Sequence, residues 1–147
     1  MKNIIYVLAL SVVLSIVAAC SPTATQTGTE SDLAGTSWEA TGFDDGSQTI
    51  TNVLVGTTLT AIFGEDGNLA GNSGCNEYNG PYKITGNQIG IGPLSSTRKA
   101  CSDPAGVMEQ EAQYQAALEN AQVFVVDGNT LELRLVDGTV AVKFAKK

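Results

Sequence analysis

Alternation of apolar and polar residues is clearest in the last third of the chain. Leu131, Leu133 and Leu135 share one face of a run whose other face carries Glu132 and Arg134, which is typical of a half-buried β-strand. Similar β-prone runs, separated by turn signals rich in Gly, Asn and Asp, indicate strands near residues 36–40, 59–63, 69–73, 82–84, 88–92, 123–126, 131–135 and 140–144. The last three runs predict an antiparallel meander with tight hairpins. Turn signals recurring about every 8–12 residues predict a β-sandwich or a β-barrel.

One helix is expected among these strands, from Met108 to Ala121, because this stretch lacks Pro, Gly and β-branched residues. Asp103 is the expected capping residue, and Pro104 suits the first turn. At the helical period, one face carries positions 107, 111, 114, 118 and 121. The fold class predicted from the residues is therefore mainly β, with a single late helix.

Glu111 is the exception in this helical stripe, because the other four positions are Val, Tyr, Leu and Ala. A carboxylate that packs against a core needs a partner, since an unpaired buried charge is costly. Arg98, on the segment before the expected helix, is the predicted partner.

The N-terminus has the pattern of an exported lipoprotein. An apolar run follows Lys2 and extends from Ile4 to Val17, which is short for a membrane span and suits the core of a signal peptide. The residues Val-Ala-Ala-Cys at 17–20 resemble a lipobox, so we expect cleavage before Cys20 and lipidation of its thiol, with acyl chains such as palmitate. The alternative is an ordinary signal peptide with an incidental cysteine.

Three segments follow from this pattern: a lipoprotein signal peptide over 1–19, lipidated Cys20 with a flexible polar tether over 20–32, and one globular domain over 33–147. The expected location is the cell envelope, on the extracytoplasmic side of a membrane. Ser21 in place of Asp favours the outer membrane in a two-membrane bacterium.

Charge and composition exclude several function classes. Removing Lys2 with the signal peptide changes the formal charge from −7 to −8, and nucleic-acid binders need basic clusters instead. The chain contains no histidine, which removes the usual general base near neutral pH and the commonest metal ligand. No Cys-x-x-Cys spacing is present, so a structural zinc site is not expected. We expect no cofactor, no metal and no catalytic activity.

Three cysteines are present, and lipidation of Cys20 would leave Cys75 and Cys101. In an oxidising compartment, such a pair in a small domain indicates a disulfide. The alternative is two buried free thiols.

Four stretches together resemble the META domain family, which includes heat-inducible envelope lipoproteins of the HslJ type. The stretches are Leu33-Ala-Gly-Thr-Ser-Trp38, Gly74-Cys-Asn-Glu-Tyr-Asn-Gly80 with Tyr82, Ser96-Thr-Arg-Lys-Ala-Cys101, and Glu109-Gln-Glu111 with Tyr114 and Leu118. The resemblance covers residues 33 to 145, and Lys99 departs from it where members often carry an apolar residue. It implies a compact antiparallel β-barrel or curled sheet, similar in topology to small lipocalin-like barrels and crossed by one helix.

The resemblance does not supply a molecular activity, although members are associated with envelope stress and heat induction. We therefore expect a non-catalytic, lipid-anchored envelope protein that supports stress tolerance through contacts with proteins or the cell wall. One alternative is a carrier of a small apolar ligand, which a barrel filled by Trp38, Phe63, Ile89 and Ile91 would exclude. Another is an inhibitor of a secreted hydrolase that acts through an exposed loop at 64–68 or 93–98.

The candidate site is a polar cluster around the two cysteines. It can be a recognition patch, or it can be a structural loop in which Arg98 neutralises Glu111. Its members beyond Cys75 and Cys101 are Asn76, Tyr78, Tyr82, Thr97, Arg98 and Glu111.

Overall fold

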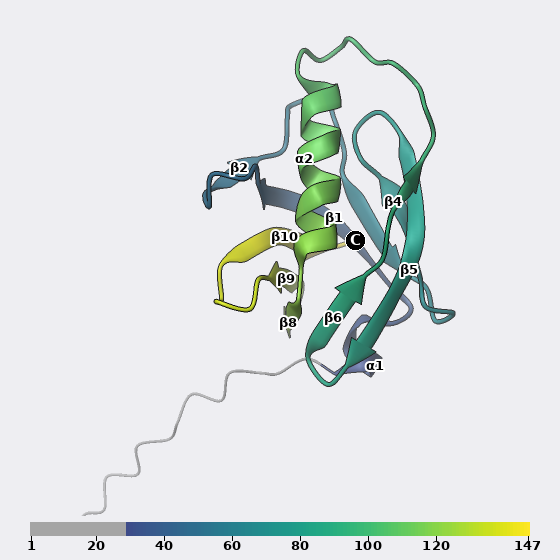
Figure 1. The fold of residues 1–147 in the computed structure, drawn as a ribbon, viewed down its shortest axis with the longest axis vertical. Helices are drawn as coiled ribbons and strands as arrows, with labels where there is room; N and C mark the ends of the chain where they lie inside the picture. The colour runs from purple at the N-terminus through teal and green to yellow at the C-terminus, as the bar shows by residue number, and fades with distance from the viewer. Residues whose placement is uncertain (1–28) are drawn as a thin grey trace, which may run out of the picture.

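The structure is a computed structural model that describes residues 29–147 (Figure 1). The expected signal peptide, the lipidation site Cys20 and most of the expected tether lie outside the described residues. The helices and strands are α1 (Glu30–Leu33), β1 (Thr36–Asp44), β2 (Ile50–Asn52), β3 (Thr60–Phe63), β4 (Asn68–Asn72), β5 (Glu77–Thr85), β6 (Gln88–Ile91), β7 (Ser95–Ser96), α2 (Val107–Asn120), β8 (Val123–Asp127), β9 (Thr130–Arg134) and β10 (Val140–Lys146). The expected domain boundary at residue 33 falls within α1, whose Leu33 is fully buried.

The strands form one antiparallel sheet that closes on itself. Its order is β10-β9-β8-β6-β5-β4-β3-β1, and β1 also pairs with β10. This closure gives an eight-stranded antiparallel barrel, which confirms the predicted fold class. The seam between β6 and β8 is short, because only Gln88 and Val123 form a ladder pair there.

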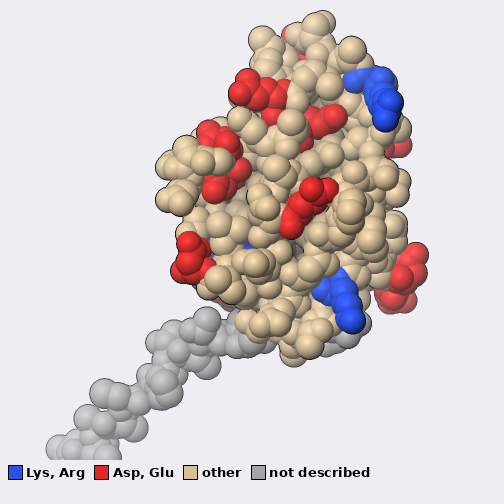
Figure 2. Space-filling view, in the orientation of Figure 1, with Lys and Arg blue, Asp and Glu red and all other residues tan. Residues whose placement is uncertain are grey.

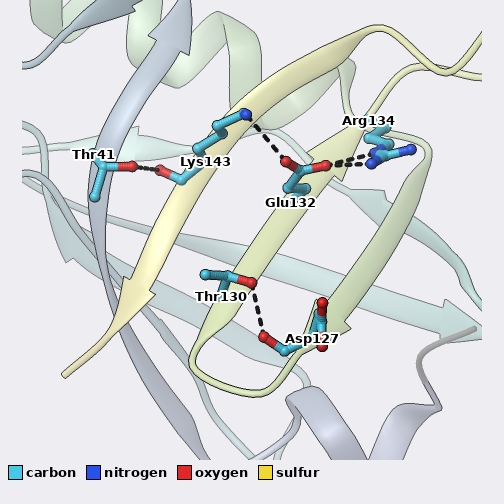
Figure 3. Close-up of polar contacts among 6 residues, drawn as sticks. All are labelled: Thr41, Asp127, Thr130, Glu132, Arg134 and Lys143. Carbon is cyan, nitrogen blue, oxygen red and sulfur yellow. Dashed lines mark hydrogen bonds and ion pairs between the residues drawn. The ribbon is translucent and has the colours of Figure 1, made fainter. Parts of the chain in front are cut away.

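The C-terminal meander forms as its sequence pattern predicts. Leu131 and Leu133 of β9 are fully buried, whereas Glu132 lies between them on the outer face. Gly128 at the β8–β9 turn has a φ of 57°, a left-handed conformation that glycine adopts without steric penalty. Thr130 closes the same turn by donating its hydroxyl hydrogen to the Asp127 carbonyl at 2.8 Å (Figure 3).

The strand beside β1 is interrupted, which the sequence pattern does not predict. Gly42 pairs with Asn52 of β2, and Thr36 pairs with Phe63 of β3. These two short strands therefore occupy successive stretches of the same edge of β1. Residues 53–58 leave the sheet between them. The distal end of β1 and β2 form a projecting hairpin, residues 42–52, which we call the β1–β2 arm.

Helix α2 packs across the barrel and completes its core. It contacts β1, β6 and β10, and in Figure 1 it stands in front of β1 and β10 with the β1–β2 arm to its left. The predicted stripe is confirmed, because all five of its positions are buried. Tyr114 lies at its centre, fully buried and in edge contact with the rings of Phe43 and Tyr78. The interior is filled by side chains that include Trp38, Phe63, Ile89 and Ile91, each no more than 7% exposed.

The predicted cap of the helix at Asp103, with Pro104 in the first turn, is wrong. The helix begins at Val107, and Gly106 occupies the N-cap position with a φ of 87° and no side-chain capping bond. The Val107 amide donates to the Pro104 carbonyl at 3.2 Å, so residues 104–107 form a turn that precedes the helix. Asp103 therefore lies too far from the first helical turn to cap it.

Candidate functional site

Glu111 lies at the centre of a buried polar network beneath the loop that joins β4 to β5. Its side chain is 8% exposed. One carboxylate oxygen accepts hydrogen bonds from the Asn76 amide N–H at 2.9 Å and from the Ser73 hydroxyl at 2.8 Å. The other oxygen accepts one from Asn76 Nδ2 at 2.9 Å. Hydrogen bonds from neutral groups of the 73–76 corner thus surround the carboxylate.

Asn76 connects this carboxylate to the segment before Cys101. Its Oδ1 accepts hydrogen bonds from the Thr97 hydroxyl and the Lys99 amide, both at 2.8 Å. Its Nδ2 also donates to the Lys99 carbonyl at 3.1 Å. Because these contacts fix which end of the amide is oxygen, the Asn76 side chain is held in one orientation.

The predicted disulfide is present between Cys75 and Cys101, whose Cα atoms lie 6.0 Å apart. It joins the same two segments that Asn76 joins by hydrogen bonds. The loop from Thr97 to Cys101 is therefore held to the β4–β5 corner both covalently and by the Asn76 side chain.

Three further polar residues belong to this region, and the sequence interpretation missed them. Ser73 donates to Glu111, and Gln115 Nε2 donates to the Ser73 hydroxyl at 3.2 Å. Gln115 in turn accepts a hydrogen bond from Ser96 at 3.0 Å. The available signal was the helical spacing, because Gln115 lies one turn after Glu111 and next to the buried stripe.

The third residue, Gln110, is 3% exposed and holds a different loop. Its Oε1 accepts a hydrogen bond from the Leu54 amide at 2.7 Å, and its Nε2 donates to the Thr57 hydroxyl at 3.0 Å. Gln110 thereby fixes both ends of the turn over residues 54–57. At the tip of that turn, Val55 is 95% exposed.

The expected ion pair between Arg98 and Glu111 is wrong. Arg98 is exposed, and among the described residues no carboxylate lies within ion-pair distance of it. Neutral donors of Ser73 and Asn76 contact both oxygens of the Glu111 carboxylate in place of a guanidinium group.

The ion pairs of the described region lie instead on the outer face of β9 and β10 (Figure 3). Glu132 contacts the Arg134 guanidinium and lies 3.2 Å from the Lys143 ammonium. Burial opposes ionisation of Glu132, but the hydrogen bonds and charges of Arg134 and Lys143 outweigh it and lower the pKa of the carboxyl group. Both cations therefore share a single carboxylate, and the group of three side chains keeps a net charge of +1.

The two tyrosines of the predicted cluster lie away from its polar centre. Tyr78 is buried, and its hydroxyl donates to the Thr60 carbonyl at 2.8 Å beside the Tyr114 hydroxyl. Burial raises the pKa of both Tyr78 and Tyr114 well above the usual value. Tyr82 packs edge-on against Phe63, and its hydroxyl donates to the Gly64 carbonyl. Tyr78 is therefore a core residue and Tyr82 is a half-buried residue packed against the core, and both have satisfied hydroxyl groups.

The polar cluster has the chemistry of a structural element. In the part of the chain that the structure describes, no buried side-chain nitrogen or oxygen lacks a hydrogen-bond partner, so the buried polar groups of the cluster all hold other parts of the protein. Residues 29–147 also contain no grouping of three or more His, Cys, Asp or Glu side chains placed to hold a metal ion.

A groove lies between α2 and the β1–β2 arm. It is a hollow of about 310 Å³, with an apolar floor made largely of alanines. A second hollow of about 190 Å³ adjoins it toward the start of the helix, and Gln113 borders both. The residues that line the larger hollow are Asp44, Asp45, Gly46, Ala112, Gln113, Ala116, Ala117, Asn120, Leu135 and Ala141.

Comparison with solved structures supports the fold. A protein from Burkholderia xenovorans, determined by NMR, has a TM-score of 0.65 at 26% identity, covering 80% of this chain and 85% of that one. A DUF4847 family protein from Bacteroides vulgatus ATCC 8482, determined by crystallography, has a TM-score of 0.57 at 17% identity, covering 80% and 96% of the two chains. The second likeness concerns the fold alone. Neither description specifies an activity.

Sequence comparison identifies the family. No curated protein matches the chain. Helix α2, the longest helix of residues 29–147, is too short to cross a membrane, and no other helix of that region qualifies. The sequence profile of the META domain matches residues 31–147, which include the barrel, the helix and the disulfide-linked polar cluster, and the chain therefore belongs to the META domain family.

Proposed function

We propose that this protein is a lipid-anchored, non-catalytic module of the cell envelope that supports stress tolerance by contacting other envelope components. The observation that carries the proposal is the filled barrel. Its interior is occupied by its own aromatic and aliphatic side chains and is crossed by α2, so recognition falls to the outer surface. The satisfied hydrogen bonds of the Asn76–Glu111 network are consistent with a structural role for the barrel's most polar region.

The anchor is proposed from the sequence around Cys20. Two or three acyl chains on one residue give stable membrane attachment, whereas a single chain gives only marginal binding. Mass spectrometry of the N-terminal peptide should find a diacylglycerol adduct on Cys20, and a Cys20→Ser variant should move to the soluble fraction. An unmodified Cys20 in a membrane-free protein would remove the anchored part of the proposal.

The same filled interior argues against the carrier alternative. Trp38 and Phe63 are 1% and 0% exposed, and the hollows described above lie on the surface and not inside the barrel. A carrier would need a cavity that buries most of its ligand.

One observation favours a second candidate, an inhibitor of a secreted hydrolase, and it concerns a loop other than the two expected from the sequence. The 93–98 segment lies along β5, to which β7 is hydrogen-bonded. The turn at 54–57 instead projects an exposed Val55 and is fixed at both ends by Gln110. Inhibition of secreted proteases that is lost in Val55→Asp would favour this candidate, provided that it is kept in Ile62→Asp, the same change at another exposed apolar position (48% exposed).

Chemical cross-linking in intact envelopes, followed by purification, tests the contact function. The expected result is a discrete set of cross-linked envelope components that depends on an intact barrel. Recovery of the protein without any specific partner, together with a co-purifying apolar molecule, would replace the contact function with the carrier function.

A further inference from the structure

We propose that the groove between α2 and the β1–β2 arm binds a basic, extended segment of a partner protein. This inference rests on the proposed contact function and assigns that function a surface and a class of partner.

The helix side of the groove is lined by small side chains. Ala112, Ala116 and Ala117 come from α2, and Ala141 of β10 faces them across the floor. Their methyl groups leave a hollow of about 310 Å³, which is near the lower end of the usual range for binding pockets. With Leu135 beside them, these residues give an apolar surface that suits a few aliphatic side chains.

The hollow extends along the helix. The smaller hollow of about 190 Å³ is lined by Leu54 and Phe43 from the arm side and by Glu109 and Gln110 from the helix. Because Gln113 borders both hollows, they follow one another along the same side of α2. This arrangement fits an extended peptide better than a compact small molecule.

The charge of the groove is one-sided. Asp44 and Asp45 line the larger hollow and Glu109 lines the smaller one, whereas neither lining contains Lys or Arg. Figure 2 shows acidic side chains spread over this face of the molecule, with two large blue patches right of centre and a small one left of centre. A partner that brings Arg or Lys side chains therefore gains electrostatic complementarity here.

The two aspartates are held in place before any partner binds. Asp44 Oδ1 accepts hydrogen bonds from the Gly46 and Gln48 amides, both at 2.9 Å. Asp45 accepts hydrogen bonds from the Ser47 amide at 3.0 Å and the Thr51 hydroxyl at 2.9 Å. These bonds lower the pKa of the Asp45 carboxyl group. A preformed wall reduces the ordering cost of association.

The same charges disfavour other occupants. Anionic lipid headgroups and nucleic acids would be repelled by Asp44 and Asp45, and the acidic balance of the chain adds to this effect. A second copy would place like charges opposite one another. An apolar stripe beside carboxylates favours a peptide in which basic and aliphatic residues alternate, because side chains of an extended chain alternate in direction.

A peptide-binding experiment tests the groove. The probe is a fluorescein-labelled peptide with four Arg-Leu repeats, and its binding to the full-length protein is measured by anisotropy at low salt. Replacing both aspartates by asparagine keeps an oxygen acceptor at each turn and removes two charges. The double change Asp44→Asn/Asp45→Asn should weaken binding by about 3- to 10-fold, as expected for two exposed charge pairs. The matched control Asp127→Asn/Asp137→Asn removes two exposed turn charges outside the groove and should change binding by less than about 2-fold at the same salt.

Two further comparisons test the apolar floor. Ala116→Trp should abolish binding by filling the groove, while Ile62→Trp, on β3 outside the groove, should leave it unchanged. An Arg-Ser peptide of the same length and charge should bind at least 5-fold more weakly. Equal losses in the two aspartate double variants, or equal binding of the Arg-Ser and Arg-Leu peptides, would overturn the proposal in favour of general charge attraction.

Photo-cross-linking in cells separates this proposal from the contact function. One photo-reactive residue replaces Asn120 on the groove rim, and in a second variant one replaces Ile62. Cross-links at 120 that map to a Lys- or Arg-containing protein segment support the groove. Cross-links at 62 alone keep the contact function and refute the groove, and capture of cell wall or lipid at 120 refutes the protein partner. Specific peptide binding without cross-links at either position would retain the groove chemistry and remove the envelope contact function.

Discussion

Replacing Glu111 by glutamine tests how the buried carboxylate is stabilised. The substitution keeps the shape of the side chain but exchanges one acceptor oxygen for an NH2 donor. In one orientation that NH2 group faces Asn76 Nδ2, and in the other it faces the Asn76 amide and the Ser73 hydroxyl. The conflict cannot be relieved by turning Asn76, because its Oδ1 is already held by Thr97 and Lys99.

The expected cost follows from this conflict. A buried donor left without an acceptor costs about 1–3 kcal/mol, and the lost bonds to a charged oxygen are stronger than neutral ones. Ser73 offsets part of the loss because its hydroxyl can donate to the Asn76 carbonyl, 2.9 Å away. We therefore expect Glu111→Gln to lower the free energy of unfolding by about 1–3 kcal/mol, a substantial part of the 5–15 kcal/mol typical of a domain.

Urea unfolding provides the assay, because the chain has one tryptophan and Trp38 is 1% exposed. Its fluorescence should report the loss of the barrel core. Glu109→Gln is the matched control, since it makes the same chemical change at an exposed position of the same helix and should alter stability by no more than about 0.5 kcal/mol.

Arg98→Ala distinguishes the observed network from the ion pair expected from the sequence. Arg98 is exposed and has no carboxylate partner among the described residues, so its removal should be nearly neutral. If Arg98→Ala destabilised the protein as much as Glu111→Gln, or if Glu111→Gln had no effect, the reasoning from hydrogen-bond donors would be refuted.

Three other outcomes are expected. The double change Cys75→Ser/Cys101→Ser opens a loop with a sequence separation of 26. It should lower the free energy of unfolding by about 3–4 kcal/mol in the chain-entropy model. Unfolding curves with and without reductant check this value, and a loss below about 1 kcal/mol would contradict it. The change Gln110→Ala should leave the Leu54 amide without its acceptor. Hydrogen exchange of that amide should therefore become at least 10-fold faster. Unchanged exchange would mean that another group holds the turn. Finally, burial raises the pKa of Tyr78 and of the tyrosine it contacts. Because the folded state therefore holds these protons more tightly, its stability should be intact below about pH 10 and fall by about 3 kcal/mol by pH 11. Urea midpoints from pH 8 to 11 measure this loss, Tyr78→Phe should reduce it by about half, and a flat profile would argue against both buried hydroxyls.

The strands that the sequence predicts well are those that form hairpins with their neighbours. In β8, β9 and β10 the alternation, the turn residues and the pairing partner all lie within a short stretch, so local reasoning suffices. Strand β2 has only three residues, Ile50–Asn52, and β7 has two. Their existence depends on edges offered by β1 and β5, which a local pattern does not reveal.

The candidate site was located by the sequence but not correctly assembled. The disulfide follows from the two cysteines that remain once Cys20 is assigned to lipid, and the position of Glu111 follows from a charge within an apolar helical stripe. The identity of the partner does not, because a carboxylate can be stabilised either by a cation or by several neutral donors. The structure contains the second arrangement, in which the backbone amide of Asn76 supplies one donor. Sequence does not display backbone donors, so charge matching led to Arg98 instead.

The filled barrel and the groove have a common structural origin. Helix α2 closes the interior by placing Tyr114 and Leu118 in the core, which leaves its small residues Ala112 and Ala116 directed to the outside. The interruption between β2 and β3 lets the β1–β2 arm project beside that exposed side of the helix. A lipocalin-like barrel with an open interior would bind its ligand within. Here the same helix that removes the internal cavity forms one wall of an external groove, and the arm supplies the other wall with its two fixed carboxylates.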